Sequence, residues 1–60
     1  GGAGELKYDI VKVEGPDHRK QYTVQVVWQD RRMATGTGSS KKAAEQEAAA
    51  RTLELLLVNQ

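Results

Sequence analysis

Two adjacent lysines, Lys41 and Lys42, stand where a helix is expected to begin and suggest a binding site for an anion. They follow the segment 36–40, Gly-Thr-Gly-Ser-Ser, whose last residue, Ser40, is a favourable N-cap. The first turn of a helix has free backbone N–H groups and the positive end of the helix dipole, so positive side chains there slightly disfavour the helix. Phosphate binds readily at a helix N-terminus, and a shared phosphate would account for both lysines.

A second basic stretch occupies residues 15–20 and reads Gly15-Pro16-Asp17-His18-Arg19-Lys20. Segments 15–20 and 36–42 together carry a charge of +3, although the whole chain carries only +1, so the remaining residues sum to −2. Charge concentrated in this way attracts a polyanion even when the net charge is small. Arg31 and Arg32 lie in a different polar segment and are expected to be ordinary surface charges.

The sequence contains no arrangement that indicates catalysis or a cofactor. Gly36 and Gly38 lack the Gly-x-x-x-x-Gly-Lys-Ser/Thr spacing of a nucleotide-binding P-loop. The carboxylates are scattered, and no serine or lysine has a general base beside it. Without cysteine, and with one histidine, thiolate or histidine clusters for a metal are excluded. We therefore expect a binding domain rather than an enzyme, with no cofactor and no small-molecule substrate.

Three short strands are predicted to position the two basic segments. Residues 8–14 are rich in β-branched residues, residues 21–28 alternate apolar and polar, and residues 32–37 form a shorter strand around Met33. Turn residues at 15–17 and 29–31 separate them. One face of the second strand carries Tyr22, Val24, Val26 and Trp28. The tyrosines and Trp28 could stack on single-stranded bases, but this alternation favours the core or its rim for Trp28.

Residues 41–57 are rich in strong helix formers, and their apolar residues follow an i, i+4 row. The row starts with small side chains, Ala44 and Ala48, so the helix is expected to lie close to the sheet at its start. The predicted fold class is α+β, a three-stranded antiparallel sheet with a C-terminal helix on one face, in the order β-β-β-α. The first and third strands then end at the same edge, which brings segment 15–20 near the start of the helix.

The segment Gly36-x-Gly38-x-Ser40-Lys41-Lys42-x-Ala44-Glu45-Gln46-x-Ala48-Ala49 resembles the C-terminal signature of the double-stranded RNA-binding domain. Gly15-Pro16-Asp17-His18, followed by an aromatic-Thr-Val strand, is similar to the region around the first two strands of that family. Together these motifs most resemble the RNA-binding domain at the end of bacterial ribonuclease III. The resemblance covers residues 8–57. The family fold is α-β-β-β-α, and the β-β-β-α order expected here agrees with it from the first strand onward.

The resemblance implies shape-selective, largely sequence-independent binding of double-stranded RNA through two segments. In the first, His18 matches the residue that enters the RNA minor groove; in the second, Lys41 and Lys42 match lysines that bind phosphates across the major groove. A basic residue often found later in this helix is replaced by Glu45. The candidate RNA-binding residues are Gly15, Pro16, Asp17, His18, Arg19, Lys20, Ser40, Lys41 and Lys42.

The sequence departs from the family at its beginning, because Gly-Gly-Ala-Gly-Glu-Leu-Lys cannot form the family's first helix. We therefore expect residues 1–7 to be a flexible leader or linker remnant. Residues 8–60 are expected to form a domain that lacks this helix and binds RNA more weakly. A ribonuclease from which such a domain came would carry its catalytic carboxylates in a separate domain.

An alternative function follows from the apolar end of the helix, which includes Leu53 and the run 55–58. These residues surround most of the last turn, so one sheet cannot cover them all. They predict a protein-interaction module, or a homodimer through the last helix. The run is far too short to span a membrane, and we expect a cytoplasmic protein.

Overall fold

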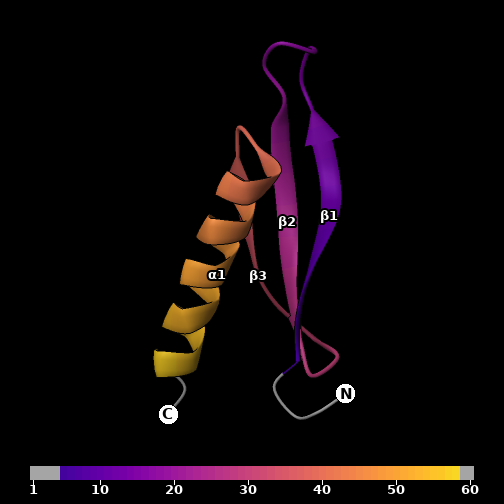
Figure 1. The fold of residues 1–60 in the computed structure, drawn as a ribbon. Coiled ribbons are helices and arrows are strands. Elements are labelled where there is room, and N and C mark those ends of the chain that lie inside the picture. The colour runs from indigo at the N-terminus through magenta and orange to yellow at the C-terminus, as the bar shows by residue number, and fades with distance from the viewer. Residues whose placement is uncertain (1–4, 59–60) are drawn as a thin grey trace.

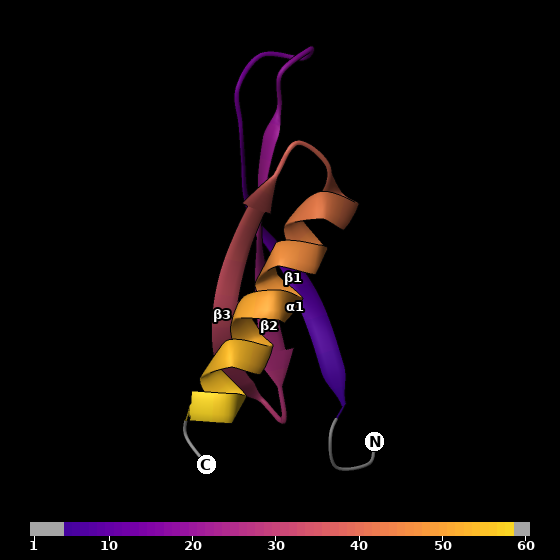
Figure 2. The same ribbon diagram turned by 90° about the vertical axis from the view of Figure 1, so that its left-hand side faces the viewer.

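The computed structural model describes residues 5–58, which form a three-stranded sheet and one helix (Figure 1). The elements are β1 (Leu6–Glu14), β2 (Gln21–Trp28), β3 (Arg31–Gly38) and α1 (Lys41–Val58). The strands are antiparallel in the spatial order β1-β2-β3, and α1 lies across one face of the sheet (Figure 2). The predicted α+β class and the β-β-β-α order are confirmed.

Two strands are longer than predicted. β1 begins at Leu6 rather than at residue 8, because Leu6 and Lys7 continue the pairing with β2, opposite Trp28 and Val27. Leu6 and Lys7, which were expected to belong to a leader spanning 1–7, are therefore part of β1. Residues 1–4 of that expected leader lie outside the described range. β3 exceeds its predicted range by one residue at each end.

The pairing of β1 with β2 contains a β-bulge. Ile10 pairs with Val24 and Lys12 pairs with Thr23, which leaves Val11 as an extra residue in β1. Such a bulge shifts the alternation of side chains by one residue. The apolar residues on both sides of the bulge therefore share the face that α1 lies on.

The turn between β2 and β3 consists of two residues, Gln29 and Asp30. Both have a positive φ, 52° and 63°, which is the backbone conformation of a tight type I′ hairpin turn. Arg31, which was expected in the turn, instead pairs with Trp28 and opens β3.

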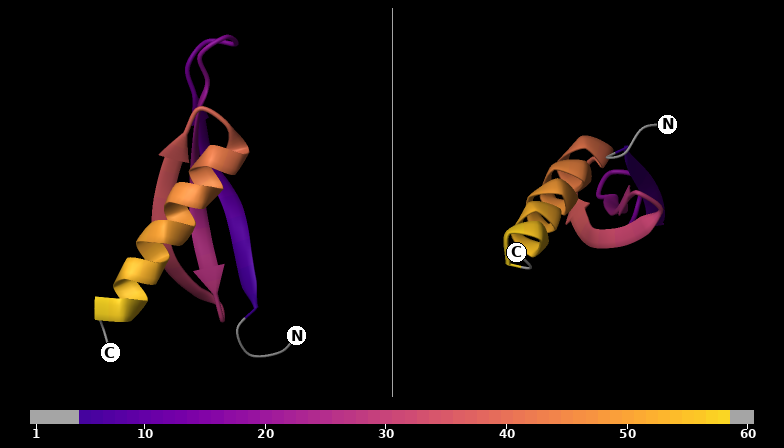
Figure 3. Two further views of the ribbon diagram at one scale, coloured as in Figure 1. Left: turned by 60° about the vertical axis from the view of Figure 1, so that its left-hand side comes forward. Right: turned by 90° about the horizontal axis from the view of Figure 1, so that it is seen from below.

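The core lies between α1 and the β2–β3 half of the sheet. Val24 and Val26 of β2 are fully buried against Ala44 and Ala48 of α1, which confirms the predicted apolar row. The row continues with buried Thr52, whose hydroxyl donates a hydrogen bond to the Ala48 carbonyl oxygen at 2.8 Å. α1 packs mainly on β3 and β2, so the residues of β1 remain exposed (Figure 3).

Side chains of α1 also hold the outer edge of β3. Glu47 Oε1 accepts a hydrogen bond from the Thr37 backbone N–H at 3.2 Å, and the Arg51 guanidinium donates one to the Thr35 carbonyl oxygen at 3.5 Å. Glu47 and Arg51 also form an ion pair at 3.2 Å. Partners for the backbone groups of an edge strand reduce its tendency to pair with other chains. These contacts also fix the position of α1 along β3, and hence where the helix begins.

Candidate nucleic-acid interface

The start of α1 is capped by Ser40, as the sequence predicted. Its Oγ accepts a hydrogen bond from the Ala43 backbone N–H at 3.1 Å, and its carbonyl oxygen accepts one from the Ala44 N–H at 3.0 Å. Both are the bonds expected of an N-cap residue. Lys41 and Lys42 occupy the first turn with exposed side chains, and that turn contains no acidic residue. Positive side chains and the positive end of the helix dipole therefore coincide at this point.

The loop between β1 and β2 has a defined backbone shape. Gly15 has a φ of +96°, and a Cβ on this residue would collide with the carbonyl oxygen of Arg19. The Arg19 backbone N–H donates a hydrogen bond to the Pro16 carbonyl oxygen at 2.8 Å, which closes the turn. The glycine and the turn thus hold His18 at the exposed tip of the hairpin.

The two predicted segments lie at the same end of the molecule. His18, Arg19 and Lys20 line a shallow hollow of about 360 Å³ together with Gln21, Gly38 and Ser39, the last of which stands just before the helix cap. The β1–β2 hairpin projects beyond the start of α1 (Figures 1 and 3). The predicted shared edge is confirmed. Lys41 and Lys42 are separated in the chain from Ser39, the last residue that lines the hollow, by Ser40 alone.

The cations of this edge have little competition from carboxylates. Lys20 lies 4.0 Å from the Asp17 carboxylate, but both side chains are well exposed, so this contact contributes little. Within residues 5–58, neither Arg19 nor the two lysines of α1 form an ion pair. A polyanion can therefore approach without first displacing a strong internal partner.

Gly36 and Gly38 position this edge, a role that the sequence pattern alone did not predict. Both pair with residues whose side chains lie on the α1 face of β2, Val24 and Tyr22. A Cβ on Gly38 would lie only 2.7 Å from the Ala43 Cβ and from the Ala44 nitrogen. The two glycines therefore let α1 lie directly on β3. A sequence pattern could have revealed this role. Residues two positions apart in a strand lie on the same face of the sheet, and for Gly36 and Gly38 this is the face that the alanines of α1 pack on.

None of the three aromatic side chains lines the hollow at the basic edge. Tyr22 packs against the core cluster, and Trp28 is half-buried at the opposite end of β2, as predicted for the core rim. Arg31 and Arg32 are exposed at that opposite end, beside the β2–β3 turn. The described part of the chain thus has one basic edge at the β1–β2 loop and a separate arginine pair far from it in the sheet.

Residues 5–58 contain no group of three or more His, Cys, Asp or Glu side chains that could hold a metal ion. None of the helical residues described forms a stretch long and apolar enough to cross a membrane.

Comparison with known proteins identifies a family and a set of relatives. The family model described as "Double-stranded RNA binding motif" matches residues 2–56. The chain is 55% identical to Ribonuclease 3 of Carboxydothermus hydrogenoformans over 51 aligned residues. The aligned region covers 85% of this chain and 22% of that protein. It is 47% identical over 57 residues to Ribonuclease 3 of Moorella thermoacetica, 95% of this chain and 24% of that protein. It is also 47% identical over 55 residues to Ribonuclease 3 of Pediococcus pentosaceus, and this alignment covers 92% of this chain and 24% of that protein. The chain therefore spans about a quarter of the length of these relatives.

Proposed function

This chain belongs to the double-stranded RNA binding motif family, and we propose that it binds double-stranded RNA by shape, largely independently of sequence. The observation that carries the proposal is the shared edge, at which the β1–β2 loop and the capped, lysine-bearing start of α1 lie at one end of the fold. One three-stranded sheet joins the two segments, so the fold holds them at the same end of the molecule before RNA binds. Preorganisation of this kind reduces the entropy lost on binding.

The two segments suit different features of an A-form duplex. Its minor groove is wide and shallow and displays 2′-hydroxyl groups, whereas its major groove is narrow and flanked by phosphates. The projecting loop, with His18 at its tip, is proposed to enter the minor groove, with Gly15, Pro16 and Asp17 shaping its backbone. The ring nitrogens of a histidine can form a hydrogen bond with a 2′-hydroxyl, which is both a donor and an acceptor.

At the other segment, Lys41 and Lys42 are proposed to bind phosphates across the major groove. Free N–H groups of the first helical turn and the helix dipole add to their attraction for phosphate. Ser40 acts indirectly, by capping the helix and fixing its start, while Arg19 and Lys20 contact the backbone next to the loop. None of these groups is proposed to read base edges, so sequence preference is low.

We also propose that the chain binds RNA without cleaving it. The relatives are named Ribonuclease 3, but the chain spans only about a quarter of their length. No carboxylate cluster is found among residues 5–58 to hold a catalytic metal. Incubation of a duplex with the chain and Mg²⁺ should leave the RNA intact, and cleavage that follows the purified chain would contradict this.

Binding through these two segments is proposed to be weaker than binding through a domain with a third contact region. Titration of an RNA duplex of about two helical turns, with duplex DNA of the same sequence as control, tests the main proposal. We expect tighter binding to RNA, because B-form DNA does not offer the same spacing of minor groove and phosphates. Equal affinity for both duplexes at moderate salt would exclude selection of the A-form.

A second candidate function is protein interaction through the leucine-rich end of α1. The observation that favours it is exposure: 61% of Leu53 and 69% of Leu57 remain accessible to solvent. Contiguous apolar surface of this kind marks interaction sites in soluble domains. This function is compatible with RNA binding, since the leucines lie at the end of α1 far from Ser40.

A further inference from the structure

One carboxylate of α1, that of Glu47, links the middle of the helix to the outer strand of the sheet. Its Oε1 accepts a hydrogen bond from the Thr37 backbone N–H at 3.2 Å and lies 3.2 Å from a guanidinium nitrogen of Arg51. The same guanidinium donates to the Thr35 carbonyl oxygen at 3.5 Å. Glu47 and Arg51 together therefore hold α1 against the second half of β3.

The rest of the contact between α1 and β3 has no interlocking side chains. Gly36 has no side chain, and a Cβ there would overlap the backbone nitrogen of Ala48. Such a contact determines how closely the helix approaches the strand. It has no ridge that fits into a groove, which is what normally sets the angle and register of a packed helix. Hydrogen bonds are directional, so the contacts of Glu47 and Arg51 can set both.

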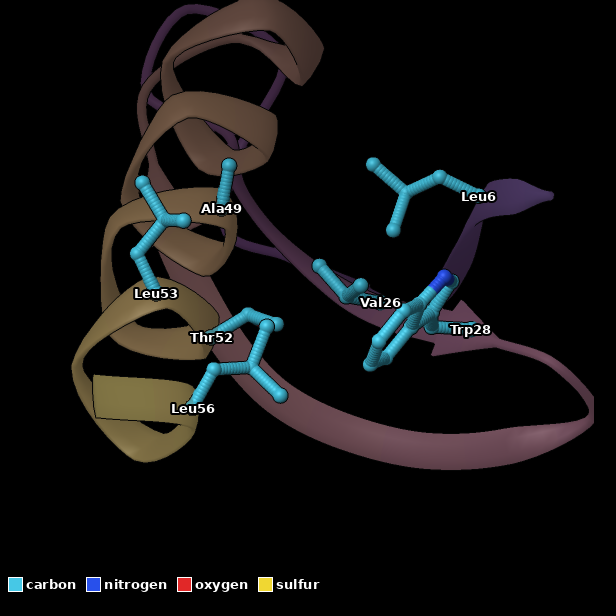
Figure 4. Close-up of a pocket in the computed structure, with 7 residues that line it drawn as sticks. All are labelled: Leu6, Val26, Trp28, Ala49, Thr52, Leu53 and Leu56. Carbon is cyan, nitrogen blue, oxygen red and sulfur yellow. The ribbon is translucent and has the colours of Figure 1, made fainter. Parts of the chain in front are cut away.

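The opposite flank of α1 faces an apolar trough of about 220 Å³ (Figure 4). Thr52 contributes the one side-chain hydroxyl of its lining, and this hydroxyl donates to the Ala48 carbonyl oxygen within the helix. Among residues 5–58, both side-chain hydrogen bonds that join α1 to the sheet are those of Glu47 and Arg51. The directional contacts thus lie on the β3 flank. The trough is lined by Leu6, Val26, Trp28, Ala49, Thr52, Leu53 and Leu56.

Glu47 lies close enough to the start of α1 to determine where the lysines stand. Lys41 precedes it by six residues, which is roughly 9 Å along a helix axis. Tilting the helix by about 10° around Glu47 would displace its first turn by roughly 1.5 Å. A lysine side chain can follow such a displacement only by giving up part of its rotamer freedom, and this reduces affinity.

The charges of Glu47 and Arg51 cancel, so the pair adds no net charge near the basic edge. Both side chains are partly exposed, at 40% for Glu47 and 58% for Arg51, and an ion pair of this kind alone contributes little to stability. The bond to the Thr37 N–H distinguishes Glu47 from an ordinary surface pair, because it connects two elements. A role in positioning therefore accounts for this arrangement better than a role in stability.

We infer that Glu47 is a positioning residue for RNA binding. It holds the start of α1 where Lys41 and Lys42 reach phosphates while the β1–β2 loop lies in the neighbouring minor groove. Arg51 orients the Glu47 carboxylate, and Glu47 itself does not contact the RNA. The inference rests on the proposed function, because it concerns the same RNA-binding site.

Two variants of equal charge test the inference by titration with an RNA duplex of about two helical turns. Glu47→Gln keeps an oxygen that can accept the Thr37 N–H, whereas Glu47→Ala has none. We expect the alanine variant to bind at least about threefold more weakly than the glutamine variant, because its first turn is no longer held in place. Charge does not explain such a result, since both variants lose the same one. Helix propensity does not explain it either, because alanine is the better helix former.

Glu54→Ala is the matched control for the loss of a carboxylate from α1. Glu54 is exposed and forms no ion pair within residues 5–58. Removal of a negative charge favours a polyanion, so this variant should bind RNA at least as tightly as the wild type. Glu47→Asp provides a second comparison at unchanged charge. Its carboxylate is one methylene shorter and cannot reach Thr37 as well, so it should bind more weakly than the wild type.

A double-mutant cycle tests whether Glu47 acts through the lysines. The glutamine and alanine variants of Glu47 are compared again in a chain that also carries Lys41→Ala and Lys42→Ala, at lower salt, where binding is stronger. Their affinities should then differ by less than about twofold, because the lysines to be positioned are absent. An undiminished difference would overturn the inference, since Glu47 would then affect RNA binding by another route.

Circular dichroism at the temperature of the titration establishes that each variant is folded, which is expected because Glu47 lies outside the buried core. The wild-type chain separates this inference from the proposed function. If the wild type does not bind duplex RNA, the proposed function fails and the inference fails with it. If the wild type binds and the alanine and glutamine variants of Glu47 have equal affinity, the inference alone fails.

Discussion

Gly36 of β3 lies directly beneath Ala48 of α1, so closely that a Cβ on the glycine would overlap the Ala48 backbone nitrogen. The same Cβ would lie 2.7 Å from the Ala44 carbonyl oxygen. Both neighbours are backbone atoms, which cannot rotate away as a flexible side chain can. This contact sets the distance between helix and sheet, and so determines where Lys41 and Lys42 stand relative to the β1–β2 loop.

Replacing Gly36 with alanine should destabilise the fold by about 1–3 kcal/mol, the usual effect of overpacking a well-packed core. A smaller gain from restricting the unfolded chain opposes this without cancelling it. For a domain of this size the melting temperature should fall by roughly 4–8 °C per kcal/mol. Thr35→Ala on the same strand, where the side chain is exposed, serves as the control. If Gly36→Ala melts at the wild-type temperature, α1 moves away from β3 at no cost.

The topology and the basic edge could be predicted because they depend on local patterns. Alternation along β2, the small residues of α1 and the turn residues each act over a few neighbours. Once three strands and a helix were assigned, their order alone brought the loop at 15–20 to the start of α1. The cap at Ser40 followed equally from its position before a run of helix formers.

Other features could not be predicted because they depend on contacts between distant segments. The length of β1 is set by pairing of Leu6 with Trp28, and the bulge at Val11 by the register of the whole strand. The role of Gly36 and Gly38 in allowing close contact with the helix follows only from the position of α1 over β3. The bulge in β3 also depends on a contact between two strands. The Gln25 side-chain amide of β2 donates hydrogen bonds there to the carbonyl oxygens of Met33 and Ala34, at 2.7 and 3.2 Å.

Removing both lysines of the first helical turn should greatly weaken RNA binding and leave the fold intact. Alanine favours helix, and loss of two positive charges near the helix N-terminus does not destabilise it. For Lys41→Ala combined with Lys42→Ala we expect more than about a tenfold loss of affinity. The slope of log K against log salt should become shallower by roughly 0.7–0.9 for each phosphate that the variant no longer neutralises.

The arginine pair at the opposite turn provides a control with the same change in charge. Arg31→Ala combined with Arg32→Ala also removes two positive charges, but from the end of the sheet far from the β1–β2 loop. Its affinity for RNA should stay close to the wild-type value. Equal losses for the two double variants would mean that net charge, rather than the start of α1, determines binding.

His18 should contribute to affinity without contributing to stability. The side chain is exposed at the tip of the hairpin, so His18→Ala is expected to unfold at the wild-type temperature. Loss of one hydrogen bond to the minor groove, about 0.5–1.5 kcal/mol, predicts a roughly twofold to twelvefold weaker complex with duplex RNA. His18→Gln keeps a donor and an acceptor and should restore part of the loss. Wild-type affinity of the alanine variant would remove His18 from the interface.

Two substitutions of Ser40 separate helix capping from RNA binding. Ser40→Ala removes the oxygen that accepts the Ala43 N–H and should lower the free energy of unfolding by about 0.5–2 kcal/mol. Ser40→Asp keeps an accepting oxygen and adds a negative charge that suits the helix dipole, so this variant should be at least as stable as the wild type. Its carboxylate, however, stands next to Lys41 and repels phosphate. We therefore expect Ser40→Asp to bind duplex RNA more weakly than Ser40→Ala does, although it is the more stable protein.

Thermal melting gives the order of stability of the two variants, and RNA titration gives the order of affinity independently. If affinity follows stability instead, the carboxylate added at residue 40 does not meet phosphate, and the start of α1 is not part of the RNA interface.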